Sequence, residues 1–233
     1  MMMSTIGKCT CCGSVRIGFV PILWQSLINE WRLSSNEVDY VNRQQGVYCL
    51  DCGTTLRSMA LALAIMRCFG CTTLFRDFVR QEQAQGLRVL EVNEAGTLTR
   101  YLAKIRQHVI TSYPDTDLMN LPYEDCSFDL VVHSDTLEHV KHPIRALSEC
   151  HRVLKPSAFC CFTVPIIVDR LTVSREGTPS YHGGPEKRNP ALLVYTEYGC
   201  DAWKHVIKAG FDECRIYSLE YPSAQALAAS RVD

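Results

Sequence analysis

Residues 117–165 read DLMNLPYEDCSFDLVVHSDTLEHVKHPIRALSECHRVLKPSAFCCFTVP, and this stretch decides the fold. Phe128–Val132 is a short apolar run rich in β-branched residues, which predicts a buried strand. Pro143–Leu154 has apolar residues at helical spacing and a proline in its first turn, so it predicts an amphipathic helix. Phe159–Val164 predicts a second buried strand. Strand, polar loop, helix and strand form one βαβ unit, which implies a parallel sheet.

The residue identities in this stretch are more specific than its hydrophobic pattern. The strings D-x-x-x-L-P-Y-x-D-x-S-F-D-L-V from Asp117, L-E-H-V at 137–140 and R-V-L-K-P at 152–156 resemble class I S-adenosylmethionine-dependent methyltransferases, most closely the type 11 domains. The resemblance spans roughly residues 88–233. It implies an α/β fold, a Rossmann-like sheet with helices on both faces, and a methyl donor across the carboxyl ends of the central strands. The switch-point rule for open α/β sheets independently places a ligand there.

The flanking sequence predicts a shortened version of this sheet. Further strands are expected at 87–92, 108–112 and 211–219, and an Ala-rich helix at about 223–230. With that helix at the end, no sequence remains for a last antiparallel strand, so we expect five or six strands. We also expect three parts: a zinc-ribbon-like module with a helical insertion at 1–55, a connecting helical segment at 56–86, and the methyltransferase domain at 87–233.

Composition indicates a reduced, cytoplasmic enzyme. The 233 residues are 47% hydrophobic and 21% charged, and the net charge is -1, which gives no general attraction to phosphate backbones. Nucleic acid is therefore a disfavoured partner. No apolar run approaches the ~20 residues of a membrane span, and we expect no membrane partner. Thirteen cysteines are an odd, scattered number, which favours a metal site over a disulfide scaffold.

Two C-x-x-C-G knuckles near the N-terminus predict a structural zinc site. Each knuckle directs two thiolates at one ion, and the glycine permits the tight turn around the sulfurs. The predicted ligands are Cys9, Cys12, Cys49 and Cys52. A rival set combines the second knuckle with Cys68 and Cys71. It ranks lower because the residues between those pairs are typical of a continuous helix.

The segment between the knuckles predicts two helices. Ser34 and Glu37 have capping-box spacing, so a helix is expected from Asn36 to about Gln45. Before it, Trp24 and Trp31 belong to a shorter amphipathic segment. A Trp stripe at this spacing belongs either to the core or to a binding surface.

The resemblance also implies which residues bind S-adenosylmethionine. In the family, an acidic residue ends the first strand before a glycine-rich turn that approaches the donor's methionine moiety. Here the corresponding segment is E-V-N-E-A-G-T at 91–97, which is poor in glycine. A carboxylate after the second strand would bind the ribose, and the D-x-x-x-L-P acid the adenine. The implied cofactor residues are Glu91, Asn93, Ala95, Gly96, Asp115, Asp117, Leu118, Met119, Ser134, Asp135 and Thr136.

Residues 165–189 predict a long excursion on the substrate side of the sheet. His182 within it is the first candidate for a general base or substrate contact, because the imidazole pKa lies near neutral pH. A surface loop histidine is the alternative. His139 is the second catalytic candidate, although this position is more often structural in the resembled family. Arg170 and Arg175 are either contacts for an anionic substrate or solvated side chains.

The expected function is transfer of a methyl group from S-adenosylmethionine to an unidentified acceptor, of small-molecule or glycan type. The protein mainly has to align donor and nucleophile. One alternative is a methyltransferase-like scaffold without turnover, which the glycine-poor turn would favour. Another is a nucleic-acid methyltransferase that uses the zinc module as a reader, which the near-neutral charge disfavours.

Overall fold

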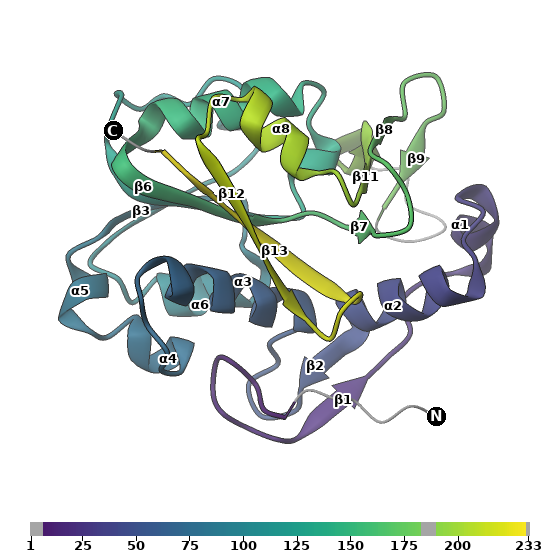
Figure 1. Ribbon diagram of the computed structural model, residues 1–233, viewed down its shortest axis with the longest axis horizontal. Helices are drawn as coiled ribbons and strands as arrows, with labels where there is room; N and C mark the ends of the chain where they lie inside the picture. The colour runs from purple at the N-terminus through teal and green to yellow at the C-terminus, as the bar shows by residue number, and fades with distance from the viewer. Residues whose placement is uncertain (1–6, 183–189, 232–233) are drawn as a thin grey trace.

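A six-stranded mixed sheet forms the centre of the molecule (Figure 1). The structure is a computed structural model and describes residues 7–182 and 190–231. The strand order is β12-β13-β6-β5-β3-β4. β4, β3, β5 and β6 are parallel to one another, whereas β13 is antiparallel to both β6 and β12. The bounds are β3 (Arg88–Val92), β4 (Gln107–Thr111), β5 (Phe128–Ser134), β6 (Leu154–Thr163), β12 (Glu213–Leu219) and β13 (Ala224–Ser230). β4 lies on one side of β3 and β5 on the other, so the order of strand addition reverses there, and the carboxyl ends of β3 and β5 form the switch point.

Helices cover both faces of this sheet, as the Rossmann-like prediction requires. α3 (Leu56–Cys68) packs on β13, β12 and β6, while α7 (Pro143–Val153) and α8 (Trp203–Lys208) lie across the opposite face (Figure 1). The predicted α/β class is confirmed, and the six strands fall within the predicted five or six. The shorter helices are α4 (Phe75–Phe78), α5 (Glu82–Gln85), α6 (Thr99–Leu102), η1 (Gly96–Leu98) and η2 (Leu137–His139).

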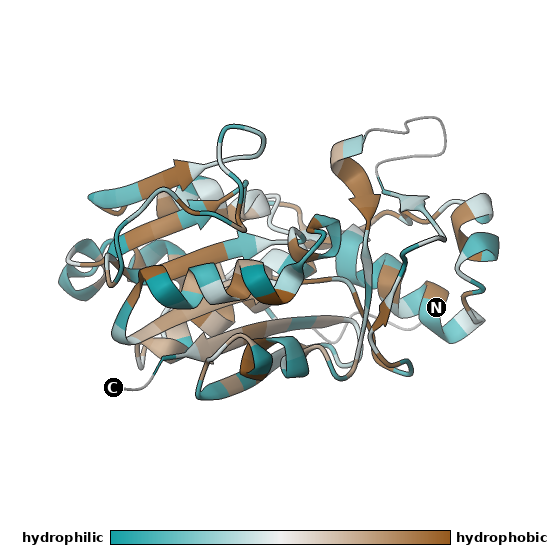
Figure 2. Ribbon diagram, turned by 90° about the horizontal axis from the view of Figure 1, so that it is seen from above, coloured by the Kyte–Doolittle hydropathy of each residue, from teal (hydrophilic) through white to brown (hydrophobic). Residues whose placement is uncertain are grey.

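The strands of the sheet separate two hydrophobic cores. Val132 and Cys161 face the layer of α3, whereas Val131 and Cys160 face α7. In Figure 2, seen from above, much of the sheet is brown, and the helices carry many teal residues. Each fully buried aliphatic side chain of this kind contributes about 1.5–3 kcal/mol relative to exposure. The two cores therefore hold the carboxyl ends of β3 and β5 at fixed positions.

The C-terminal segment is a strand, and the predicted Ala-rich helix at 223–230 is wrong. β13 pairs with β12 over its whole length and with β6 over its second half. Ala224, Ala226 and Ala228 face α3, and Leu227 and Ala229 face the other core. The small alanines let α3 lie close to the sheet. The last antiparallel strand is therefore present, and the shortening lies beyond β4, which is the sheet edge.

The N-terminal region contains a small two-stranded sheet and two helices. β1 (Ile17–Phe19) pairs antiparallel with β2 (Val47–Cys49), and α1 (Gln25–Glu30) and α2 (Ser35–Gly46) lie between them in sequence. The predicted capping box is present, because Glu37 N–H donates to Ser34 Oγ while Ser34 N–H donates to the Glu37 carboxylate. The predicted helical segment at 56–86 is divided into α3, α4 and α5, and Gly70 at φ 66° follows α3.

The excursion after β6 folds into short strands near the carboxyl rim of the main sheet. Residues 196–199 form β11 between β7 and β8. Residues 183–189 of the predicted excursion lie outside the described residues. The bounds are β7 (Ile166–Ile167), β8 (Val173–Ser174), β9 (Ser180–Tyr181), η3 (Pro190–Leu192), β10 (Leu193–Val194) and β11 (Thr196–Gly199). Within the described ranges, every helix is too short or too polar to cross a membrane.

Candidate functional site

A pocket of about 730 Å³ lies between the N-terminal helices and the carboxyl rim of the main sheet. We call it the rim pocket. Its size and its mainly apolar walls are typical of small-molecule sites. The apolar lining is Ile22, Leu23, Trp24, Leu27, Trp31, Leu33, Val41, Pro165, Ile167 and Leu192, and the polar lining is Gln45, Arg57, Asp135, Glu138, His139 and His182. The tryptophans of the amphipathic segment therefore line a cavity.

An ion-pair network fastens the N-terminal wall of the rim pocket to the excursion. Arg170 Nε donates to Glu37 Oε1 at 2.7 Å, and its NH1 donates to Glu197 Oε1 at 2.8 Å. Arg175 NH1 donates to the second oxygen of Glu197 at 3.2 Å, and its guanidinium lies 4.7 Å from the Trp31 ring. These contacts assign both arginines a structural role. Hydrogen bonding to Arg170 lowers the pKa of Glu37.

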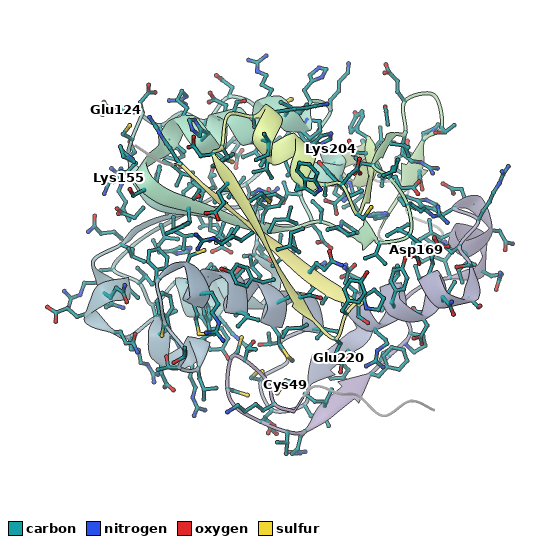
Figure 3. All side chains as sticks on the ribbon, viewed as in Figure 1. Cys49, Glu124, Lys155, Asp169, Lys204 and Glu220 are labelled. Carbon is teal, nitrogen blue, oxygen red and sulfur yellow. The ribbon has the colours of Figure 1, made fainter. Side chains whose placement is uncertain are left out.

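The same wall is closed by contacts further along the excursion. Trp31 Nε1 donates to Ser180 Oγ at 2.8 Å, and its ring lies 5.8 Å from the ring of His182. On α2, burial raises the pKa of Tyr40 to about 12, with further effects of Glu37 and Asp169. Figure 3 labels Asp169 beside α2 and β7. The rim pocket is thus built jointly by segments that are more than a hundred residues apart.

At the inner end of the rim pocket, Asp135 collects several hydrogen bonds. It has a left-handed φ of 45° and follows β5 directly. Its Oδ1 accepts from Thr163 Oγ1 at 3.0 Å, and its Oδ2 accepts from Gln45 Nε2 at 2.7 Å and from Arg57 NH1. Arg57 also donates to Gln45 Oε1 at 2.6 Å. The predicted donor-facing Asp135 is therefore held rigidly and is charge-balanced by α3.

Glu138, His139 and His182 come together on the wall of the rim pocket. Their ligand atoms lie within 4.8 Å of one another. Burial raises the pKa of Glu138 and lowers that of His139, and burial next to His139 lowers the pKa of His182 to about 4. Both imidazoles are consequently neutral near pH 7 and can accept a proton or a hydrogen bond. The two predicted catalytic histidines share one site, and their rings are 5.2 Å apart.

The glycine-poor turn after β3 is organised by Glu91. The buried carboxylate accepts hydrogen bonds from Ala95 N–H at 2.7 Å and Thr99 Oγ1 at 2.5 Å, and His108 Nε2 lies 2.7 Å from its other oxygen. Gly96 has φ 57°, and a Cβ built there would be 3.1 Å from Ser58 Oγ. The backbone of this turn therefore lies directly against the start of α3.

Asn93 joins the loops that follow three neighbouring strands. It has φ 56°, the left-handed geometry that asparagine tolerates. Its Nδ2 donates to Thr136 Oγ1 at 3.4 Å after β5, and its Oδ1 accepts from Tyr113 N–H at 3.1 Å after β4. Ser134, at the end of β5, shares a 2.8 Å hydrogen bond with Thr163. The predicted cofactor segments after β3, β4 and β5 thus meet at the switch point.

The remaining predicted cofactor residues lie on the same rim but outside the rim pocket. Asp115 and Asp117 are exposed, and Asp117 Oδ1 accepts from Met119 N–H at 2.8 Å. Leu118 is buried in the core on the α7 side, and Met119 packs against it. Of the predicted cofactor set, only Asp135 lines the rim pocket. The rim pocket therefore adjoins the implied donor site rather than coinciding with it.

The four predicted zinc ligands form one cluster. Cys9 Sγ lies 3.6 Å from Cys52 Sγ, and Cys12 Sγ lies 3.6 Å from Cys49 Sγ. A tetrahedral zinc ion with Zn–S bonds of about 2.3 Å requires sulfurs about 3.8 Å apart. In each knuckle the glycine has positive φ, and its N–H donates to the carbonyl of the first cysteine. The donor set and spacing therefore fit a structural zinc ion. Cys49 is labelled at this end of β2 in Figure 3.

The rival cysteine set is not assembled. Cys68 Sγ lies 3.7 Å from Cys161 Sγ in the main core, and Cys71 Sγ lies 3.1 Å from Thr73 Oγ1.

Three polar residues of the rim pocket were not predicted from the sequence, namely Gln45, Arg57 and Glu138. Glu138 had a local signal, because it adjoins His139 in the L-E-H-V string. Gln45 and Arg57 had none, since their contacts with Asp135 span about ninety and eighty residues of sequence.

The sheet order and the helices on both faces define a Rossmann-like α/β fold. Residues 68–162 match the family described as "Methyltransferase domain". This part of the chain is therefore similar to methyltransferase domains, as the strings at 117–156 indicate.

Named relatives share parts of this region. The chain is 28% identical over 145 residues to a glycine/sarcosine/dimethylglycine N-methyltransferase of Actinopolyspora halophila, covering 57% of this chain and 23% of that protein. It is 43% identical over 47 residues to a 2-phytyl-1,4-naphtoquinone methyltransferase of Nostoc punctiforme, covering 20% of each. The chain thus spans about a quarter or less of the length of these curated relatives.

A solved structure from Thermotoga maritima, described as a SAM-dependent methyltransferase and "possible histamine N-methyltransferase", superimposes with a TM-score of 0.43 at 14% identity. The superposition covers 76% of this chain and 90% of that one.

Proposed function

We propose that this protein transfers the methyl group of S-adenosylmethionine to a small-molecule acceptor bound in the rim pocket. The observation that carries the proposal is the position of Asp135, which belongs both to the implied donor rim and to the inner end of the rim pocket. A donor held by the turns after β3 and β5 would direct its sulfonium toward that shared end. The apolar walls suit an acceptor with an aromatic or aliphatic body better than a free amino acid or a glycan.

The chemistry asks little of the protein beyond alignment. The sulfonium makes the methyl group electrophilic, and the enclosed pocket would hold the nucleophile in line with it. His139 and His182 are neutral and lie on the pocket wall, so either can take a proton from a hydroxyl or amine as the bond to carbon forms. The comparisons give no support to the alternative of a scaffold without turnover.

Calorimetry with S-adenosylhomocysteine, the demethylated product, tests donor binding. We expect binding by the wild-type protein and a loss of about tenfold or more in Asp117→Ala, because one charge-assisted hydrogen bond to the adenine amine disappears. Glu124→Ala is the matched control, since this exposed carboxylate lies at the opposite end of the sheet (Figure 3). If millimolar ligand produced no heat with the wild-type protein, only the scaffold alternative would remain.

We further propose that Cys9, Cys12, Cys49 and Cys52 bind a structural zinc ion in the N-terminal module, residues 1–55. A closed site of four cysteines leaves no open coordination position, so the ion would contribute folding energy and no catalysis. The ion would fix the ends of β1 and β2 next to α3. Because Arg100 donates to the carbonyl oxygen of Cys52, the site is also tied to the helix that follows the glycine-poor turn.

A further inference from the structure

Glu138 clusters with His139 and His182, and the methyl transfer outlined above gives this carboxylate no role. Glu138 is 1% exposed, and neither carboxylate oxygen has a hydrogen-bond partner among the described residues. The nearest basic atom is His139 Nε2, 3.8 Å from Oε1, which is too long for a hydrogen bond. A buried carboxylate without a partner is costly, so this position calls for a proton or a cation.

The backbone around the cluster fixes the tautomer of His139. Its Nδ1 lies 3.0 Å from the carbonyl oxygen of Leu193, which can only accept a hydrogen bond. Nδ1 therefore carries the hydrogen, and Nε2 turns its lone pair toward Glu138. Metal-binding histidines are usually oriented in this way, with the second ring nitrogen donating to a carbonyl or carboxylate. Tyr195 N–H donates to the Glu138 carbonyl at 2.7 Å, which holds this pair of residues against the same segment.

We propose that Glu138, His139 and His182 bind a divalent transition-metal ion on the wall of the rim pocket. The three ligand atoms lie within 4.8 Å of one another, and all three residues line the pocket. Two imidazoles and one carboxylate are a ligand set that suits Zn²⁺, Fe²⁺ and related ions and leaves coordination positions open. Asp135 is not a ligand, because Arg57, Gln45 and Thr163 occupy its oxygens.

The inference deepens the proposed function and rests on it for its consequence. Histidines that bind the ion cannot also accept the acceptor's proton, so the ion would replace them in this role. An open position on the ion would take an oxygen of the acceptor and lower the pKa of that hydroxyl, so that its proton leaves to solvent. The resulting oxygen would form the bond to the methyl carbon while the carbon–sulfur bond breaks and its electron pair stays on sulfur. The acceptor class is then a hydroxyl compound with an apolar body.

Metal titration of the full-length protein tests the site. Protein that retains zinc in its cysteine site is titrated with ZnCl₂ and MnCl₂, and bound metal is counted by elemental analysis after gel filtration. We expect one ion per chain beyond the cysteine-bound ion. Glu138→Gln and His182→Asn should each weaken that additional ion by more than about tenfold. His142→Asn, an exposed histidine outside the rim pocket, should leave it unchanged.

Two variants are used because one of them could fail to fold. Gln and Asn are polar and no larger than the residues that they replace, and either folded variant is enough to test the site. Absence of an additional ion in the wild-type protein, or unchanged metal affinity in both variants, would overturn the proposal. The latter result would mean that Glu138 carries a proton. S-adenosylhomocysteine calorimetry on the same samples separates the two proposals. Variants that lose the metal should still bind this ligand, whereas failure of the donor proposal would abolish its binding and leave the metal count unchanged.

Discussion

The role of a single residue could be predicted where that role depends on residues close to it in sequence. Each knuckle, at Cys9 and at Cys49, contains both the turn and the second cysteine, so the spacing alone was enough to predict the cluster. Asn93 could likewise be expected in left-handed geometry. Glu138 could not be found in this way. Its significance comes from burial of its carboxylate without a partner, and the segment held against it, with Leu193 and Tyr195, lies more than fifty residues away.

The zinc proposal is tested by replacing one of its ligands. Cys49→Ser should remove the cysteine-bound zinc, because serine is a poor zinc ligand and three thiolates leave the site open. Loss of the ion should also lower the melting temperature, since binding energy of a structural ion is folding energy. Cys200→Ser is the control, an exposed cysteine outside the cluster. Zinc content equal to that of the wild-type protein would reject this ligand set.

At the scale of elements, the βαβ unit was predictable because period and turn chemistry agree along β5, α7 and β6. β13 was not. Its alanines have high helix propensity, but pairing with strands on both sides outweighs a propensity of a few tenths of a kcal/mol per residue. β11 gave no sequence signal of its own, since its pairing partners β7 and β8 belong to an excursion without a clear period.

The contribution of the ion pair between Glu37 of α2 and Arg170 of the excursion can be measured separately from that of the helix cap. Glu37→Gln keeps a residue that suits the third position of a capping box but removes the charge opposite Arg170. We expect a loss of about 2 kcal/mol in the free energy of unfolding at neutral pH. Ser34→Ala is the complementary control, since it removes the cap and keeps the ion pair. Denaturant unfolding monitored by circular dichroism measures both.

The pH dependence of this loss has a defined sign. Because Arg170 lowers the pKa of Glu37 in the folded protein, the ion pair's stabilisation is complete above the ordinary carboxyl value of 4.5. It is lost as the pH falls below that value and through the lowered one. The difference between wild-type protein and Glu37→Gln should therefore shrink in acid. A difference that stays constant from pH 7 to pH 3 would contradict the assignment.

At the scale of the whole molecule, the place of the predicted donor rim could be derived from the sequence, whereas the rim pocket could not. The rim lies at the switch point, which strand order alone determines. The rim pocket needs α1, α2 and the excursion to meet above Asp135, and the contacts that bring them together, such as those of Arg170 with Glu37 and Glu197, are long-range ion pairs. No local pattern records such pairs. The extent of the three predicted parts, 1–55, 56–86 and 87–233, stays a prediction.

The central claim is that donor and acceptor meet at the shared end of two adjoining sites. A crystal structure of the protein with S-adenosylhomocysteine tests it most directly. We predict the adenine within hydrogen-bonding distance of Asp117, the methionine end against the turn of Asn93 and Gly96, and the sulfur directed past Asp135 into the rim pocket. A ligand whose nucleoside fills the rim pocket itself, or whose sulfur points away from it, would contradict the account.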